Sequence, residues 1–460
     1  MQVQIEKKCQ GLFKAPRFIT IAFRLYSISE KGTTASESLR MRVKPKQFQR
    51  TMKSSKEDFI KFLAEHFLDG DLIEQVRNLL RFSRESNPIG LPSFICASLS
   101  EKAPEIMFML LYRLIVKKDK IDESIKPLIL GMLTLFVRLG KGENQRDHSR
   151  LLRIIWPCAT HFDAKRFWSS ETVQRAMIND DYELLTPFPK IDDLKDILPT
   201  GSSLKIPAFM FNKIYKEAYD PDKKVFYGDF IDKMFFNKEL ILYAQRAHLS
   251  EWFNQIESYH LEDTNRAFDW DHICPHSYIF NKKKIHRALR DWYGSNGNFR
   301  AWPYAWNRAE GDLAPPKKLH PKENDEINWW ADTLNRPRLS SDELKTYLLE
   351  ASVCDTQWVD LKVDTGDEIK QPPCAKEVIR CILNRNLKIC KEWYEQLQIE
   401  TLLPEIPENR ENLFYPLLNM KVWGDAEEED DWPAYQLSIR ETNTQLYFSF
   451  NIGGHTIAEN

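Results

Sequence analysis

Apolar residues recur every three or four positions through much of the chain, which is the spacing of one face of an α-helix. Between about residues 45 and 180 this pattern predicts a series of amphipathic helices. Residues 125–139 form the most apolar stretch, with Lys126 and Arg138 near its ends. A helix that spans a bilayer needs about 20 apolar residues. We therefore predict a buried core helix here and no membrane role.

The same spacing predicts individual helices at 148–157, 164–178, 238–253, 341–352 and 375–397. Residues 17–28 are rich in aromatic and β-branched side chains, which favours a strand and leaves a helix open. Prolines and polar residues between 187 and 203 indicate an irregular connection.

The last part of the chain changes its pattern. Residues 435–440 and 445–452 flank the polar sequence at 441–444, and they predict a closing β-hairpin. The run at 425–431 is acidic and predicts an exposed loop.

The expected fold is mostly α-helical, with an embedded ββα element and a small C-terminal β-hairpin. A chain of 460 residues is long for one core, so two or three domains are expected. We divide it into a mainly helical region at 1–235, a ββα region at 236–335, and a helical region ending in the hairpin at 336–460.

Composition adds two limits. The formal net charge of −2 gives no global positive field, so any surface for nucleic acid must be local. The eight cysteines are scattered and form no CxxC motif, and no apolar leader opens the chain. Reduced thiols and a cytoplasmic protein are expected.

The residues with the most telling chemistry lie between 269 and 319. They include an Asp–His pair (Asp271, His272), a Gly–Asn step (Gly297, Asn298) and a second asparagine, Asn307. Hydrolysis of a phosphodiester with one divalent metal needs a base, hard oxygen ligands and a group that orients the base. These residue types in this order predict a nuclease.

Each residue has an expected role. Asp271, at the end of a short strand, would offer a carboxylate oxygen to Mg²⁺ or Mn²⁺. Asn307, on a short helix, would be the second metal ligand. His272 would take a proton from the attacking water, because imidazole titrates near neutral pH. Asn298 would hold loop backbone and orient the imidazole.

This segment resembles the HNH, or ββα-metal, nuclease family, and more narrowly the nuclease half of GmrSD-type restriction and phage-defence proteins. In those proteins a DHI-x-P motif is followed by GN-[LF], an Asn-bearing helix and a lysine. The matching residues here are 271–275, 297–299, Asn307, and Lys317 or Lys318. The likeness is specific over about 236–320 and looser over 17–180.

The resemblance implies a metal-dependent DNA endonuclease that cuts one strand per active site and acts in anti-phage defence or restriction. The DGQQR-type motif of the family's nucleotide-dependent module does not occur in this sequence. We therefore do not carry nucleotide dependence over. We expect sensing to come from partner proteins of a multi-gene defence system, such as one resembling type II Zorya.

Local charge supports contact with DNA. Residues 281–320 hold nine Lys or Arg and three acids, so the local charge is 9 − 3 = +6. Such contacts position the phosphate backbone without reading sequence. The expected contacts are Lys282, Lys283, Lys284, Arg300, Arg308 and Lys317. The interleaved aromatic residues could stack on bases, although packing in a small core is favoured.

Two other hypotheses stay open. Cys274 and His276, with His272 and Asp269, could form a zinc site, since these ligand types suit that metal. A degenerate HNH fold could instead serve as a non-catalytic scaffold that binds DNA or protein. Asp269 could also orient Asp271 without touching the metal, or it could be a solvated residue at the end of the strand.

Overall fold

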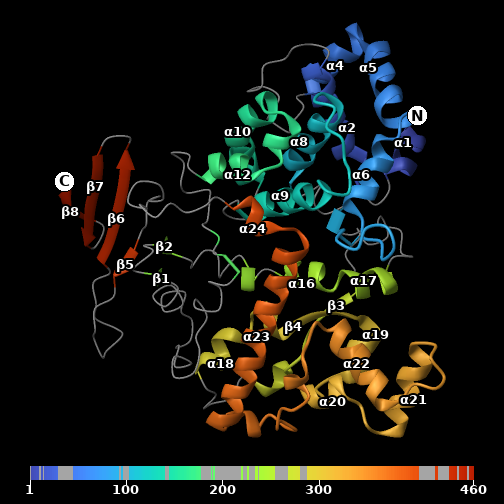
Figure 1. The fold of residues 1–460 in the computed structure, drawn as a ribbon, viewed down its shortest axis with the longest axis vertical. Helices are drawn as coiled ribbons and strands as arrows, with labels where there is room; N and C mark the ends of the chain where they lie inside the picture. The colour runs from blue at the N-terminus through green and yellow to red at the C-terminus, as the bar shows by residue number, and fades with distance from the viewer. Residues whose placement is uncertain are drawn as a thin grey trace.

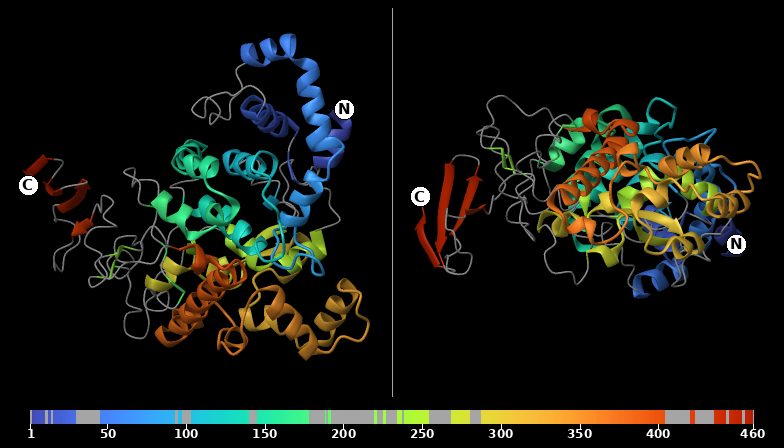
Figure 2. Two further views of the ribbon diagram at one scale, coloured as in Figure 1. Left: turned by 45° about the horizontal axis from the view of Figure 1, so that its top comes forward. Right: turned by 90° about the horizontal axis from the view of Figure 1, so that it is seen from below.

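The structure of this chain is a computed structural model. The described residues are 2–9, 12–13, 15–29, 45–92, 95–96, 103–139, 145–177, 188, 190–191, 219–220, 225–226, 234–236, 238–253, 268–279, 287–403, 420–422, 435–442, 445–452 and 455–459. Most of them are helical, as the periodicity predicts (Figures 1 and 2).

The N-terminal region consists of helices that surround α8 and α9. Its elements are α1 (Gln2–Cys9), α2 (Ala15–Ser29), α4 (Pro45–Ser54), α5 (Lys56–Leu63), the short π-helix η1 (Ala64–Leu68), α6 (Leu72–Leu80), α8 (Pro104–Ile115), α9 (Lys126–Leu139), α10 (Gln145–His161), α11 (Ala164–Phe167) and α12 (Ser170–Met177). Helix α9 buries Ile129, Leu130 and Leu133, so the expected core helix is confirmed. Within the described ranges, no helix is long and apolar enough to cross a membrane.

Residues 17–28 form a helix, α2, and the strand prediction is wrong. Phe18, Ile21, Ala22 and Leu25 are all fully buried. Their spacing of three, one and three residues places them on one helical face that packs on α8. Burial of this face outweighs the weak β-preference of the aromatic and β-branched side chains.

A unit that contains the antiparallel strands β3 and β4 and several short helices follows the N-terminal region. Its elements are α16 (Glu239–Ala244), α17 (Arg246–Phe253), β3 (Phe268–His272), η4 (His276–Tyr278), α18 (Arg287–Trp292), η5 (Asn296–Asn298), β4 (Phe299–Pro303), α19 (Tyr304–Glu310) and α20 (Pro315–Leu319). Strands β3 and β4 pair antiparallel, with Asp271 opposite Arg300 and His272 opposite Phe299. Helix α19 follows β4 without a loop.

The predicted helix at 238–253 is interrupted at Gln245. Its buried side chain accepts a hydrogen bond from the amide of Ala301 at 2.8 Å and donates to the carbonyl of Ala351 at 2.6 Å. Gln245 therefore joins the α16–α17 bend to strand β4 and to the end of α22.

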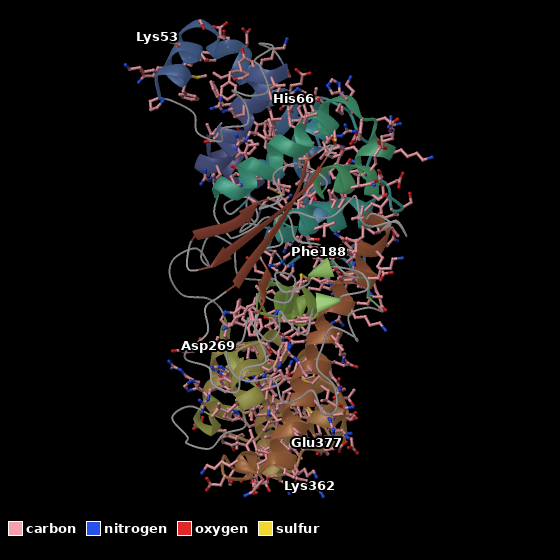
Figure 3. The ribbon with its side chains drawn as sticks, turned by 90° about the vertical axis from the view of Figure 1, so that its left-hand side faces the viewer. Lys53, His66, Phe188, Asp269, Lys362 and Glu377 are labelled. Carbon is pink, nitrogen blue, oxygen red and sulfur yellow. The ribbon has the colours of Figure 1, made fainter. Side chains whose placement is uncertain are left out.

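The C-terminal helices pack against both regions. They are α21 (Asn324–Thr333), α22 (Ser341–Ala351), η6 (Thr356–Trp358), η7 (Glu368–Lys370), α23 (Pro372–Gln396) and α24 (Ile399–Leu402). The long helix α23 passes beside η5, and near its end the indole of Trp393 donates to Thr134 of α9 at 3.0 Å. One hydrophobic cluster contains buried residues from Cys9 to Leu403. Lys53 of α4 lies near one end of the molecule and Lys362 near the other, with Asp269 of β3 between them (Figure 3).

The described strands near the C-terminus form one sheet with the order β5-β6-β7-β8. They are β5 (Met420–Val422), β6 (Tyr435–Thr442), β7 (Gln445–Ile452) and β8 (His455–Glu459). The expected hairpin is the β6–β7 pair, which is antiparallel. A further short pair is β1 (Tyr219–Asp220) and β2 (Val225–Phe226). The acidic run at 425–431 and most of the connection at 187–203 lie outside the described residues.

Candidate functional site

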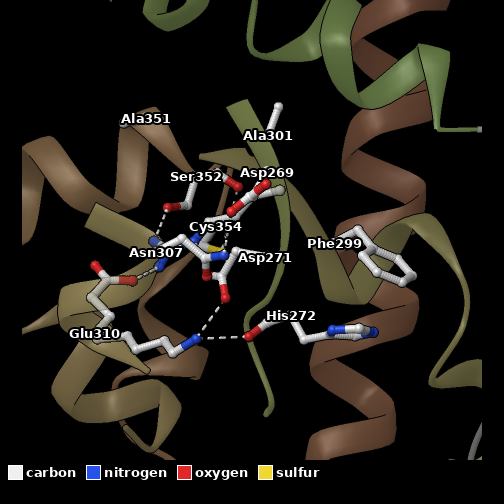
Figure 4. Close-up of polar contacts among 12 residues, drawn as sticks. Asp269, Asp271, His272, Phe299, Ala301, Asn307, Glu310, Ala351, Ser352 and Cys354 are labelled. Carbon is white, nitrogen blue, oxygen red and sulfur yellow. Dashed lines mark hydrogen bonds and ion pairs between the residues drawn. The ribbon is translucent and has the colours of Figure 1, made fainter. Parts of the chain in front are cut away.

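The predicted site residues come from strand β3, turn η5 and helix α19. Successive side chains of a strand point to opposite faces, so Asp269 and Asp271 share one face of β3 while His272 projects from the other. Figure 4 shows this division: the carboxylates lie on the side of Asn307, and the imidazole of His272 lies beside Phe299. The structure thus brings Asp269, Asp271 and Asn307 together on one face and places His272 apart from them.

Asp271 is buried between two cations. Its side chain is 4% exposed. One carboxylate oxygen accepts from Nε of Arg300 at 2.7 Å, and the other accepts from Nζ of Lys318 at 2.7 Å. Burial alone would raise the pKa of this carboxyl, but Arg300 and Lys318 outweigh it and hold the pKa below its usual value. Both oxygens of Asp271 are therefore already paired with positive charge.

Arg300 belongs to this buried network and not to the surface. Its guanidinium also bonds Glu310 of α19 and donates to the hydroxyl of Ser352 at 2.9 Å. The side chain is 0% exposed. We expected Arg300 to contact phosphate, and its complete burial contradicts that expectation. Burial raises the pKa of the Glu310 carboxyl to about 7, against the opposing effect of Arg300.

Lys318 is the lysine that reaches the site, while its neighbour Lys317 is exposed. Besides Asp271, the ammonium of Lys318 donates to the backbone carbonyl of His272 at 2.9 Å. It therefore fixes the end of β3 from two directions. The sequence alone does not distinguish Lys317 from Lys318. In the structure, helix α20 directs Lys318 toward Asp271 and leaves Lys317 exposed.

His272 is held by aromatic contacts. Its ring stacks on Tyr293 at 4.8 Å between centroids and 7° between planes, and it lies 4.2 Å from the ring of Phe299. Burial lowers the pKa of His272 to about 4; His276, Lys238 and Lys318 act in the same direction and Asp271 against it. With this pKa the imidazole is neutral at pH 7.

Asn298 braces the loop that follows His272. Its side-chain oxygen accepts from the amide of Cys274 at 2.8 Å, and its amide nitrogen donates to the carbonyls of Cys274 and Tyr293, both at 3.3 Å. These bonds hold loop backbone, as the sequence suggests for this position. The link to the His272 ring is indirect and runs through Tyr293, on which that ring stacks.

Turn η5 is also clamped from helix α23. The buried guanidinium of Arg385 donates to the carbonyls of Asn296 and Phe299 at 2.6 Å and of Gly297 at 3.1 Å. A Cβ at Gly297 would lie 2.0 Å from the carbonyl oxygen of Ile382, so only glycine fits at this approach.

Sequence reasoning missed Arg385, Glu310 and Ser352. A signal existed for Arg385, because it continues the buried, helically spaced series Val378, Ile382, Arg385, Ile389 on α23. An arginine within an apolar face needs a buried set of acceptors. Nothing local in the sequence distinguishes Glu310 or Ser352 from ordinary polar residues.

Asn307 contacts Asp269 and not Asp271. Its side-chain amide nitrogen lies 3.2 Å from a carboxylate oxygen of Asp269, and both side chains are half-buried. Mg²⁺ takes oxygen ligands, so Asn307 could hold a cation only through its side-chain oxygen, after a rotation of the amide that breaks this hydrogen bond. A cation at Asp271 would instead meet the charges of Arg300 and Lys318. Of the two carboxylates, Asp269 is the one that lies beside Asn307 and forms no ion pair with a described residue.

A zinc site does not fit the described residues. Burial raises the pKa of the Cys274 thiol to about 12, which disfavours the thiolate that zinc requires. Over the described part of the chain, no three His, Cys, Asp or Glu side chains gather closely enough to hold a metal by themselves.

The remaining expected DNA contacts differ in position. Lys282, Lys283 and Lys284 lie outside the described residues. Arg308 is exposed on α19 and its guanidinium lies 3.7 Å above the ring of Tyr304, itself 45% exposed. The tryptophans of this segment pack inside, as favoured: Trp292, Trp302 and Trp306 are buried.

Comparisons with protein-family models, with curated proteins and with solved structures found no match to this chain.

Proposed function

We propose that this chain is a metal-dependent DNA endonuclease of the HNH type that cuts one strand per active site. One observation supports the proposal: antiparallel strands β3 and β4 and helix α19 carry two carboxylates and an asparagine on one face and a neutral histidine on the opposite face of β3 (Figure 4). The Asn298 side chain braces the loop that follows His272. A role as the effector of an anti-phage or restriction system in the cytoplasm, with sensing by partner proteins, belongs to the same proposal.

His272 is the proposed general base. Its low pKa keeps the imidazole unprotonated at neutral pH, and the stack on Tyr293 fixes the plane of the ring. Neither imidazole nitrogen has a hydrogen-bond partner among the described residues. A water molecule can therefore be deprotonated there without first breaking an existing bond.

Asp269 and Asn307 are the proposed holders of Mg²⁺ or Mn²⁺. When bound, the cation would stabilise the negative charge that develops on the phosphate and on the leaving 3′ oxygen. This assignment replaces the expected pair of Asp271 and Asn307. Asp271 instead forms ion pairs with Arg300 and Lys318 and thereby fixes the strand from which Asp269 and His272 project.

The second candidate is a non-catalytic scaffold that binds DNA or protein. It is favoured by the pairing of both Asp271 oxygens with buried cations, since a metal-binding carboxylate is usually left open. It is also favoured by the separation of His272 from the Asp269–Asn307 face. The two candidates make opposite predictions for cleavage.

Conversion of supercoiled plasmid to nicked circles in Mg²⁺ or Mn²⁺ separates them. We expect nicking by the wild type and at least a 100-fold loss in His272→Ala, since general-base catalysis contributes about 10²–10⁴-fold. Nicking should also be lost in Asn307→Ala, because the proposed cation would lose a ligand. Asn324→Ala, an exposed asparagine on α21, is the matched control and should keep activity. Equal nicking by all four proteins, or intact plasmid in every case with partner proteins present, would favour the scaffold.

A further inference from the structure

A hollow of about 750 Å³ lies in the helical N-terminal region, away from strands β3 and β4. The loop between α8 and α9 forms one wall, and the end of α10 with α11 forms the other. Its rim carries Lys117, Lys118, Lys120 and Lys165, all of them exposed. Nothing in the proposed cleavage chemistry uses these residues.

A buried ion pair fixes the shape of the hollow. Arg113 and Asp119 are 0% and 2% exposed and are joined by two bonds, of 2.7 and 2.8 Å. The same guanidinium donates to the carbonyls of Ala159 and Phe162 at 2.9 and 2.7 Å. The indole of Trp168 donates to Asp119 at 2.7 Å. These bonds tie the lysine-bearing loop to the end of α10 and to α11. The opposite charges of Arg113 and Asp119 cancel one another.

The four lysines outnumber the acids that line the hollow. No ion pair joins any of them to another described residue. The other carboxylates of the lining face backbone: Asp122 accepts from the amides of Ser124 and Ile125, and Asp163 accepts from the amide of Arg166. Apart from the Arg113–Asp119 pair, the lining therefore carries 4 − 2 = +2 in a chain whose formal charge is −2.

We propose that this hollow is a second DNA-contact surface, where the four lysines bind phosphates of the backbone. Lysine is a mobile point charge that neutralises phosphate without reading bases. The tied loop carries Lys117, Lys118 and Lys120 on one wall and α11 carries Lys165 on the other, so the backbone positions of the four lysines are fixed before phosphate binds. The choice of DNA among anions rests on the proposed function, but the binding itself requires no cleavage.

The test uses the full chain and a fluorescent 20–30 base-pair duplex in EDTA, where no nicking occurs. The variant replaces Lys117, Lys120 and Lys165 by glutamine and Lys118 by asparagine. Lys118 has a φ of +55°, a conformation that asparagine tolerates better than glutamine does. A control variant replaces Lys56, Lys61, Lys362 and Lys376, which are exposed elsewhere, by glutamine. Both variants change the formal charge equally, from −2 to −6.

We expect the hollow variant to bind DNA about 10-fold more weakly at 0.1 M salt. The slope of log affinity against log salt should fall by about 0.9 for each phosphate that the variant no longer neutralises. In the control variant, both the DNA affinity and the salt slope should change less than in the hollow variant. Equal weakening in both folded variants, or none in the hollow variant, overturns the proposal. Weaker binding of ATP with unchanged binding of DNA overturns it as well, because the hollow would then serve a free nucleotide.

This outcome is separable from the failure of the proposed function. Loss of nicking in His272→Ala with unchanged DNA affinity concerns the cleavage site alone. Melting temperatures of both lysine variants, expected to match the wild type because all eight positions are exposed, exclude unfolding as the cause.

Discussion

Replacement of Asp271 by alanine should destabilise the protein far more than replacement of Asp269. The two carboxylates lie two residues apart on the same face of β3, yet their surroundings differ. Asp271 is 4% exposed and bonds Arg300 and Lys318, whereas Asp269 is half-buried and its described contact is the amide of Asn307. Comparison of the Asp271→Ala and Asp269→Ala proteins therefore distinguishes a structural carboxylate from one that is free to bind a ligand.

The magnitudes follow from these contacts. Removal of one partner from a buried ion pair costs about 3–5 kcal/mol, because the remaining charge stays buried without compensation. In Asp271→Ala the uncompensated charge falls mainly on Lys318, since Arg300 keeps Glu310. A single hydrogen bond at partial exposure contributes only about 1 kcal/mol, which is the expected cost of Asp269→Ala. Total stabilities are about 5–15 kcal/mol, so the first change is severe and the second is mild.

Thermal unfolding followed by circular dichroism measures the contrast. At roughly 2–4 °C per kcal/mol for a cooperative unit of 150–250 residues, Asp271→Ala should melt about 6 °C or more below the wild type. Asp269→Ala should melt within a few degrees of the wild type. Nicking activity should be lost in the folded Asp269→Ala protein, because the proposed metal would lose its carboxylate ligand.

The reverse pattern would refute this reasoning. If Asp271→Ala melts like the wild type and only loses activity, Asp271 is an open ligand and its pairing with Arg300 and Lys318 does not stabilise the fold. The expectation of Asp271 and Asn307 as the metal pair would then replace the present assignment.

Three further predictions concern the same unit. Gly297→Ala should lower the melting temperature and disturb the turn that carries Asn298, because the new Cβ would meet the Ile382 carbonyl at 2.0 Å; Gly294→Ala, with nothing within 4 Å, is the control and should be neutral. Lys318→Met should destabilise by about 3 kcal/mol or more, because it leaves part of the Asp271 charge unpaired, while the exposed Lys317→Met should not; equal effects in denaturant titrations would contradict the geometry. The single-turnover nicking rate should fall on acidification with a midpoint near 4, because burial lowers the pKa of His272 to about 4 and protonation removes the base; a midpoint near the ordinary value of 6.5 would show that the imidazole is solvated.

The sequence predicts the helices well because their burial is periodic and local. Helix α9 and the β6–β7 pair follow directly from spacing. Residues 17–28 are harder, since their composition favours a strand while the spacing of Phe18, Ile21 and Leu25 favours the helix that the structure shows. Composition and periodicity conflict there, and burial of the apolar face decides the outcome.

The sequence predicts which segment holds the candidate site, but it does not predict which residues of that site contact one another. The residue types and their spacing select the segment around Asp271 and His272. Their partners depend on strand register, which places Arg300 opposite Asp271, and on the orientation of α20, which turns Lys318 inward. The clamp from Arg385 depends on a helix almost ninety residues away. Such long-range pairings leave no local pattern.

Binding of Mn²⁺ to the full chain, measured by electron paramagnetic resonance, tests the central claim most directly. The proposed site predicts saturable binding of one cation that is lost in Asp269→Asn and in Asn307→Ala. It should be retained in Asp332→Asn, an exposed carboxylate on α21. Absence of saturable binding in the wild type, or equal binding by all four proteins, would contradict a metal site on this face of β3.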